Sequence, residues 1–152
     1  MQLSQKETSL LKELKDQEKL CVEKYNKHAS AASDQQLKSL FTQIAQSEQT
    51  HYNTITQIEN GTVPQMSGSS SSSAQPTFNA TYSAAENTNM QNDCYLCTDL
   101  LSGEKHVSQL YNTCIFEFKN EGIRNALNHI QKEEQEHGKM IYDYMAANNM
   151  YS

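Results

Sequence analysis

Hydrophobic residues recur at alternating steps of three and four along four segments of the chain. This spacing places them on one face of an α-helix, as in a helix that packs against a core. No segment shows the strict alternation of a half-buried strand with a partner. The pattern therefore predicts an all-α protein, an antiparallel four-helix bundle in a single domain over residues 1–152. The four helices are expected at about residues 5–31, 35–59, 93–119 and 122–147.

Local signals set the expected ends of these helices. Residues 4–7 have the form S-x-x-E, a capping box that starts the first helix near residue 5. Residues 33–34 supply a turn and a new N-cap, and the Asn-Gly pair at 60–61 stops the second helix. Asn92 or Asp93 is expected to cap the third helix.

Six polar side chains interrupt the hydrophobic stripes where apolar residues are expected. Two pairs share the form Glu-x-x-His, and a Glu and a His three positions apart lie on one helix face. Two further glutamates precede the motif glutamates by thirty positions and also lie on apolar stripes. The six residues are Glu18, Glu48, His51, Glu104, Glu134 and His137.

The second half of the chain repeats the first at an offset of 86 positions. Because residues equidistant from a turn lie level in an antiparallel hairpin, Glu18 should face Glu48, and Glu104 should face Glu134. Positions that meet an identical residue 86 positions later include Leu14, Glu18, Lys19, Tyr25, Asn26, Ile44, Glu48, Gln49, His51 and Ile55.

Both glutamate pairs reach one level only if the two hairpins pack with their turns at opposite ends. The chain must then travel the length of the bundle, ~40 Å, between the second and third helices. Residues 61–91 hold both prolines and the run Ser69 to Ser73, and they lack apolar periodicity. We expect this segment to be a mostly irregular, mobile crossover, since thirty extended residues can reach ~100 Å.

Four carboxylates and two imidazoles in a dry core predict a metal site. An unpaired buried charge costs several kcal/mol, and two divalent cations would balance four carboxylates. Carboxylate oxygen and imidazole nitrogen suit iron and manganese, so we expect two Fe or Mn ions, with iron favoured. The alternative is a buried polar network without metal. The adjacent Glu133 and Glu136 are expected to face water.

Composition narrows the function classes. The chain has 152 residues and a net charge of -6, which argues against nucleic-acid binding. No apolar run approaches a membrane span, and the first residues do not resemble a signal segment, so membrane binding is not expected. Cys94 and Cys97 form one C-x-x-C, whereas a zinc or rubredoxin-type site needs a second such pair. Cys21, Cys97 and Cys114 are expected to fill the core as small apolar groups.

The six residues resemble the ligand set of the ferritin-like superfamily, which includes bacterioferritins, rubrerythrins and manganese catalases. The likeness implies a ferritin-like bundle with a dinuclear iron or manganese site. Glu48, Glu134 or both would then bridge the ions, each His would cap one ion, and Glu18 and Glu104 would each serve one. Tyr25 and Tyr111 resemble the tyrosine that bacterioferritins carry near their metals, which implies a role beside the ligands.

The last two predicted helices most resemble the bacterial spore-coat F family. The likeness lies in TDLLSGEKHVSQLYN at 98–112, in EEQEHGKMIYDYM at 133–145 and in Tyr151. It implies a spore-coat or mother-cell cytoplasmic location, with other coat proteins or a second copy of the chain as partners. The chain lacks a rubredoxin module, and Val107 replaces a carboxylate that rubrerythrins carry.

The sequence is therefore consistent with three alternative functions. The favoured one is a spore-coat-type protein that holds a dinuclear metal site. The second is a di-metal oxidoreductase or ferroxidase that acts on oxygen or peroxide. The third is a structural coat protein without metal.

Overall fold

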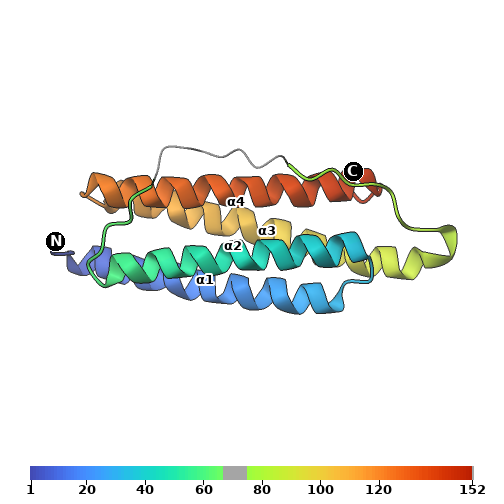
Figure 1. The fold of residues 1–152 in the computed structure, drawn as a ribbon, viewed down its shortest axis with the longest axis horizontal. Coiled ribbons are helices and arrows are strands. Elements are labelled where there is room, and N and C mark those ends of the chain that lie inside the picture. The colour runs from blue at the N-terminus through green and yellow to red at the C-terminus, as the bar shows by residue number, and fades with distance from the viewer. Residues whose placement is uncertain (67–74, 152) are drawn as a thin grey trace.

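The chain folds into four long helices, as a computed structural model shows for residues 1–66 and 75–151 (Figure 1). No strand occurs within these described residues, which confirms the predicted all-α four-helix bundle. None of the helices among them is both long enough and apolar enough to cross a membrane. The elements are α1 (Gln5–Ala31), α2 (Gln35–Glu59), a 3-10 turn η1 (Ala84–Glu86), α3 (Asn87–Glu117) and α4 (Glu121–Ala147).

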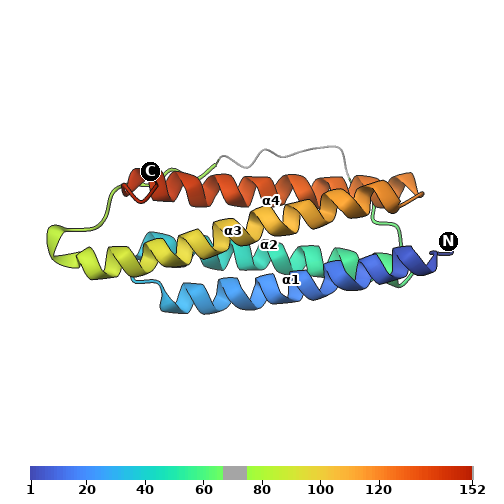
Figure 2. The same ribbon diagram turned by 180° about the vertical axis from the view of Figure 1, so that it is seen from behind.

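The helices form two antiparallel hairpins, α1–α2 and α3–α4, whose turns lie at opposite ends of the bundle (Figure 1). Seen from behind, α3 lies beside α1, and the start of α1 is at the end where α3 turns into α4 (Figure 2). α2 ends at one end of the bundle and α3 begins at the other, as the expected crossover requires (Figure 1). The arrangement brings the middles of all four helices together.

The start of α3 differs from the expectation. The helix begins at Asn87, so neither Asn92 nor Asp93 caps it. A second S-x-x-E sequence forms a capping box at the start of η1, which leads directly into α3, and in it the backbone N–H of Ser83 donates to Glu86 Oε2 at 2.8 Å. The carboxylate of Asp93 instead accepts the backbone N–H groups at the α1–α2 turn, 2.9 Å from Ser33 and 3.0 Å from Asp34.

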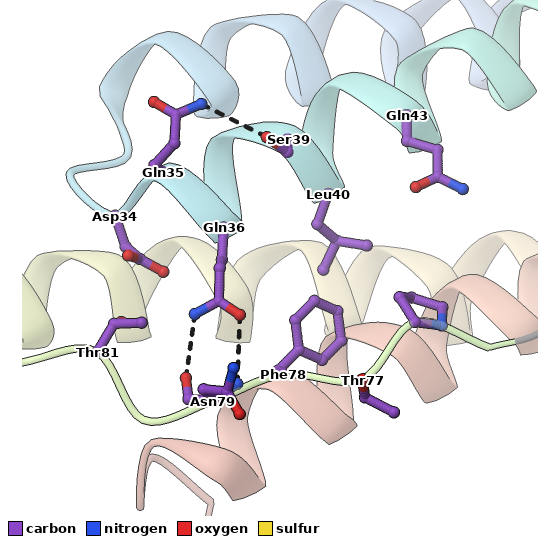
Figure 3. A pocket seen from close by; sticks show the side chains of 11 residues that line it. Asp34, Gln35, Gln36, Ser39, Leu40, Gln43, Thr77, Phe78, Asn79 and Thr81 are labelled. Carbon is purple, nitrogen blue, oxygen red and sulfur yellow. Dashed lines mark hydrogen bonds between the residues drawn. The ribbon is translucent and has the colours of Figure 1, made fainter.

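The described part of the crossover packs against the end of the bundle. The Gln36 side chain exchanges two hydrogen bonds with the backbone of Asn79, at 3.0 and 3.2 Å (Figure 3). The Phe78 ring meets Tyr144 edge-on with centroids 5.5 Å apart. A pocket of about 570 Å³ lies beside this contact, and none of the six predicted site residues lines it. The expected irregular run Ser69 to Ser73 lies outside the described residues.

Two apolar clusters fill the bundle, one in each half of its length. The first contains Leu37, Phe41 and Met145, and the second contains Leu11 and Ile123. Fully burying one such side chain contributes about 1.5–3 kcal/mol. The polar residues on the stripes therefore form a layer between two apolar cores that hold the helices in register.

Candidate metal centre

The structure brings all six predicted residues into one buried cluster midway along the bundle. Each is at most 5% exposed. Their ligand atoms form two groups, and within each group these atoms lie within 4.8 Å of one another. The groups are Glu18, Glu48, His51 and Glu134, and Glu48, Glu104, Glu134 and His137. Glu48 and Glu134 belong to both groups, which is the arrangement expected of two sites that share bridging carboxylates.

Three carboxylates converge on a single ring nitrogen of His51. Its Nδ1 lies 2.7 Å from Glu134 Oε1, 3.3 Å from Glu48 Oε2 and 3.7 Å from Glu18 Oε2. A ring nitrogen carries at most one proton, so it cannot satisfy three oxygens by hydrogen bonding. A cation among these atoms would contact all four.

His137 faces the cluster in the same way. Its Nδ1 lies 2.9 Å from Glu48 Oε1 and 3.5 Å from Glu104 Oε1. The rings of His137 and His51 stack with centroids 5.8 Å apart and planes at 24°. Both Nδ1 atoms thus point into the shared cluster from the α2–α4 side.

The outer nitrogens of the two rings are held by equivalent residues of the opposite hairpin. His51 Nε2 lies 3.0 Å from Glu133 Oε1, and His137 Nε2 lies 3.1 Å from Ser47 Oγ. Glu133, expected to face water, is thus only partly exposed and also contacts the cluster through His51. Glu133 and Ser47 occupy equivalent positions of the repeat, each directly before a motif glutamate. An acceptor at Nε2 fixes the ring and leaves Nδ1 free for a metal.

Two tyrosines satisfy one oxygen of each side carboxylate. Tyr25 Oη donates to Glu104 Oε1 and Tyr111 Oη donates to Glu18 Oε1, both at 2.5 Å. The second oxygens, Glu18 Oε2 and Glu104 Oε2, have no hydrogen-bond partner among the described residues. Both oxygens of Glu134 likewise lack a hydrogen bond of suitable geometry there, although Oε1 lies 2.7 Å from His51 Nδ1. The cluster therefore presents four acceptor atoms without a hydrogen bond in a buried core.

Charge in the cluster is strongly perturbed. Burial raises the pKa of Glu18 to about 8, and burial and the Glu104 carboxylate raise the pKa of Glu134 well above its usual range. Burial opposes a charge on His137, but the carboxylates of Glu104 and Glu48 raise its pKa to about 9. Without a cation, the core is neutralised by protons on some of its acids and on its histidines.

The donor set fits two hard or borderline cations. Carboxylate oxygens outnumber imidazole nitrogens, no cysteine belongs to either group, and this composition suits iron or manganese. The four orphaned oxygens support the same conclusion, because a buried acceptor without a partner is costly. The fold and the cluster together define an all-α bundle with a carboxylate–histidine core.

Comparison with known protein families finds one similarity, and it covers the second hairpin. Residues 92–152 match the family model of the Coat F domain. The match covers most of α3 and all of α4, with Glu104, Glu134 and His137, and it confirms the expected likeness to the spore-coat F family for this part. No curated protein and no solved structure matches the chain.

Cysteines take no part in the cluster. Cys97 and Cys114 are buried, as expected of core residues, while Cys21 and Cys94 are half-buried. Burial raises the pKa of the Cys114 thiol to about 11, so that this thiol stays protonated at neutral pH.

Proposed function

We propose that this chain is a spore-coat-type protein that holds two divalent metal ions, iron or manganese, in the core of its bundle. The observation that carries the proposal is the convergence of four carboxylates and two imidazole Nδ1 atoms on one buried cluster with orphaned oxygens. An apolar layer would stabilise a purely structural bundle better, since buried charges seldom add stability. Cation binding explains why the layer is ionic.

The two groups of ligand atoms assign the residues to the ions. Glu18 and His51 would hold one ion, Glu104 and His137 would hold the other, and Glu48 and Glu134 would serve both. Such a pair of ions supplies redox chemistry and Lewis acidity when bound. The protein's own part is to hold its carboxylates in place, to orient both Nδ1 atoms inward and to exclude bulk water from the cluster.

Tyr25 and Tyr111 would position the side glutamates rather than bind metal. Each hydroxyl donates to one carboxylate oxygen and leaves the other oxygen facing the cluster. Burial raises the pKa of both tyrosines well above the usual range, so they remain protonated donors. The role expected of the two tyrosines beside the ligands would therefore be to hold these glutamates in position by hydrogen bonding.

The Coat F match supports a coat context for the proposed metal protein. The matched segment contains half of the proposed ligands, and the first hairpin completes the set. We infer a place in the spore coat or in the mother cell that assembles it. Other coat proteins or a second copy of the chain would be its partners there.

Metal analysis tests the proposal directly. Protein purified without added metal, then loaded with Fe²⁺ or Mn²⁺ and desalted, should retain two ions per chain, one for each group. A Glu48→Gln/Glu134→Gln variant should retain none, while Glu136→Gln, which removes a charge on the same helix outside the cluster, should retain both. Anomalous scattering at the iron and manganese edges should then place the ions between the six side chains. A folded protein that retains close to zero ions would overturn the proposal.

A further inference from the structure

A surface pocket between α3 and α4 reaches the cluster. It measures about 400 Å³, and both Glu104 and Glu134 line it. Leu101 and Gly138 form part of its wall. Two proposed ligands are therefore the inner end of a pocket that opens on the outside of the second hairpin.

The first hairpin carries the equivalent pocket, but this one does not reach the cluster. It lies between α1 and α2 and measures about 330 Å³. Neither Glu18 nor Glu48 is among the described residues that line it. The residues that line it are Lys19, Val22, Glu23, Gln49 and Tyr52. In the other pocket the equivalent positions of the repeat are, in the same order, Lys105, Ser108, Gln109, Gln135 and Gly138.

The decisive difference is Tyr52 in place of Gly138. Lys15, at the position equivalent to Leu101, lies with its Nζ 5.8 Å from the centroid of the Tyr52 ring. The same Nζ also pairs with Glu59 Oε2 at 2.6 Å. Tyr52 is thereby held in the groove of the first hairpin. Gly138 has no side chain at the matching place, and the nearest side-chain atom to its Cβ position is Leu101 Cδ1, at 3.5 Å.

Solvent exposure of the cluster follows the same asymmetry. Glu104 is 5% exposed and His137 is 4% exposed, whereas Glu18 is fully buried and His51 is 1% exposed. The equivalent lysines Lys105 and Lys19 line both pockets, and Glu23 of the α1–α2 pocket stands where the α3–α4 pocket has the neutral Gln109. The Glu23 carboxylate would attract a cation, so this charge difference does not explain why the α1–α2 pocket stops short of the cluster. The size of the residue at the Gly138 and Tyr52 positions does explain it.

We propose that divalent cations reach and leave the cluster through the α3–α4 pocket, which Gly138 keeps open, and that Tyr52 closes the equivalent route through α1–α2. This inference rests on the proposed function, because it concerns access to the same site. A cation that enters here meets Glu104 and Glu134 before the other ligands.

The test exchanges the two residues and measures rates of metal uptake. Gly138→Tyr should slow uptake of Co²⁺ by the metal-free protein by at least about tenfold, followed by stopped-flow absorbance of the bound ion. Release to a chelator should slow by the same factor, so the equilibrium affinity stays unchanged. Gly138→Ala is the matched control: its Cβ would meet Leu101 Cδ1 at an ordinary 3.5 Å and leaves the pocket open, so the wild-type rate is expected.

The reverse exchange keeps the test decisive if Gly138→Tyr does not fold. Tyr52→Gly should speed uptake by opening a second route, and the double exchange should restore the rate lost in Gly138→Tyr. Wild-type rates in Gly138→Tyr, or in Tyr52→Gly, would overturn the access proposal while equilibrium binding of two ions still supports the metal site. Absence of Co²⁺ binding to the wild type at equilibrium would overturn both.

Discussion

The hydroxyl of Tyr25 on α1 donates a 2.5 Å hydrogen bond to Glu104 Oε1 on α3. Tyr111 on α3 returns the same bond, also 2.5 Å, to Glu18 on α1. The two tyrosines and the two glutamates are related by the 86-position repeat. Each hairpin thus provides the hydrogen-bond donor for a carboxylate of the other hairpin. The two bonds connect α1 to α3, and they leave the second oxygen of each glutamate facing the cluster.

Replacing either tyrosine by phenylalanine should cost a similar amount of stability. Tyr25→Phe and Tyr111→Phe each leave one buried carboxyl oxygen without its donor, which costs about 1–3 kcal/mol in the metal-free protein. Urea denaturation in the presence of EDTA measures the loss. Both variants should still retain two ions, because neither tyrosine belongs to a ligand group. Loss of the ions in either variant would show that the hydroxyl is itself a ligand.

Glu134→Gln should abolish metal binding without destabilising the metal-free fold. Burial and the neighbouring Glu104 carboxylate raise the pKa of Glu134 and so favour its uncharged form in the metal-free core, and the amide is likewise uncharged and nearly equal in volume. Urea denaturation in EDTA and metal analysis of the same preparations separate the two effects. Glu136→Gln serves as the control that removes one charge outside the cluster. A large loss of stability in metal-free Glu134→Gln would indicate that this side chain is structural.

Bound metal should stabilise the wild type strongly. At free Mn²⁺ of about 100 times the dissociation constant, one site adds about 2.7 kcal/mol, which raises the Tm of a domain this size by roughly 5–10 °C. Thermal unfolding followed by circular dichroism, with Mn²⁺ or with EDTA, gives the shift. A Glu18→Gln/Glu104→Gln variant should show no shift. An equal shift in that variant would place the stabilising ions on the surface.

The hydrophobic stripes predicted the bundle, and together with the two Glu-x-x-His motifs and the repeat they predicted the residues of the cluster. Glu18, Glu48, Glu104 and Glu134 stood out because each occupies a position that helix periodicity reserves for apolar side chains. Equal distances from the turns then predicted that they meet at one level. These inferences succeed because the period of a helix and its rise per residue are fixed by backbone geometry.

Contacts outside the stripes were not predictable in the same way. Glu133 and Glu136 flank the motif on the same helix, and periodicity does not say which flank faces α2; the structure pairs Glu133 with His51. The expected start of α3 lies too late because Asn92 and Asp93 are residue types that favour the N-cap of a helix, whereas the helix begins at Asn87. The Asp93 carboxylate instead accepts a hydrogen bond from the backbone of Ser33 in the α1–α2 turn. A contact between residues this far apart in the sequence leaves no local sequence pattern.

Acid should weaken the fold in part through Glu7. This residue is related to Asp93 by the repeat, and its Oε1 accepts the backbone N–H of Lys119 at the opposite turn, at 3.2 Å. Its Oε2 accepts the Ser4 N–H at 2.7 Å. The Ser4 bond, helped by the Lys119 bond and opposed by burial, lowers the pKa of Glu7 below its ordinary value of 4.5.

The sign of the pH effect follows from that lowered pKa. The unfolded chain binds the proton at a higher pH than the folded one, so the stabilising contribution is fully present above about pH 4.5–5 and fades as pH falls through the folded pKa. Glu7→Gln keeps an acceptor oxygen but loses the charge, and should cost about 1 kcal/mol at pH 7. Urea denaturation of both proteins between pH 3 and pH 7 should show the difference shrinking toward acid. The exposed Glu13→Gln controls for the loss of one negative charge on α1. A difference that stays constant over this range would mean that the Glu7 charge does not hold the turn.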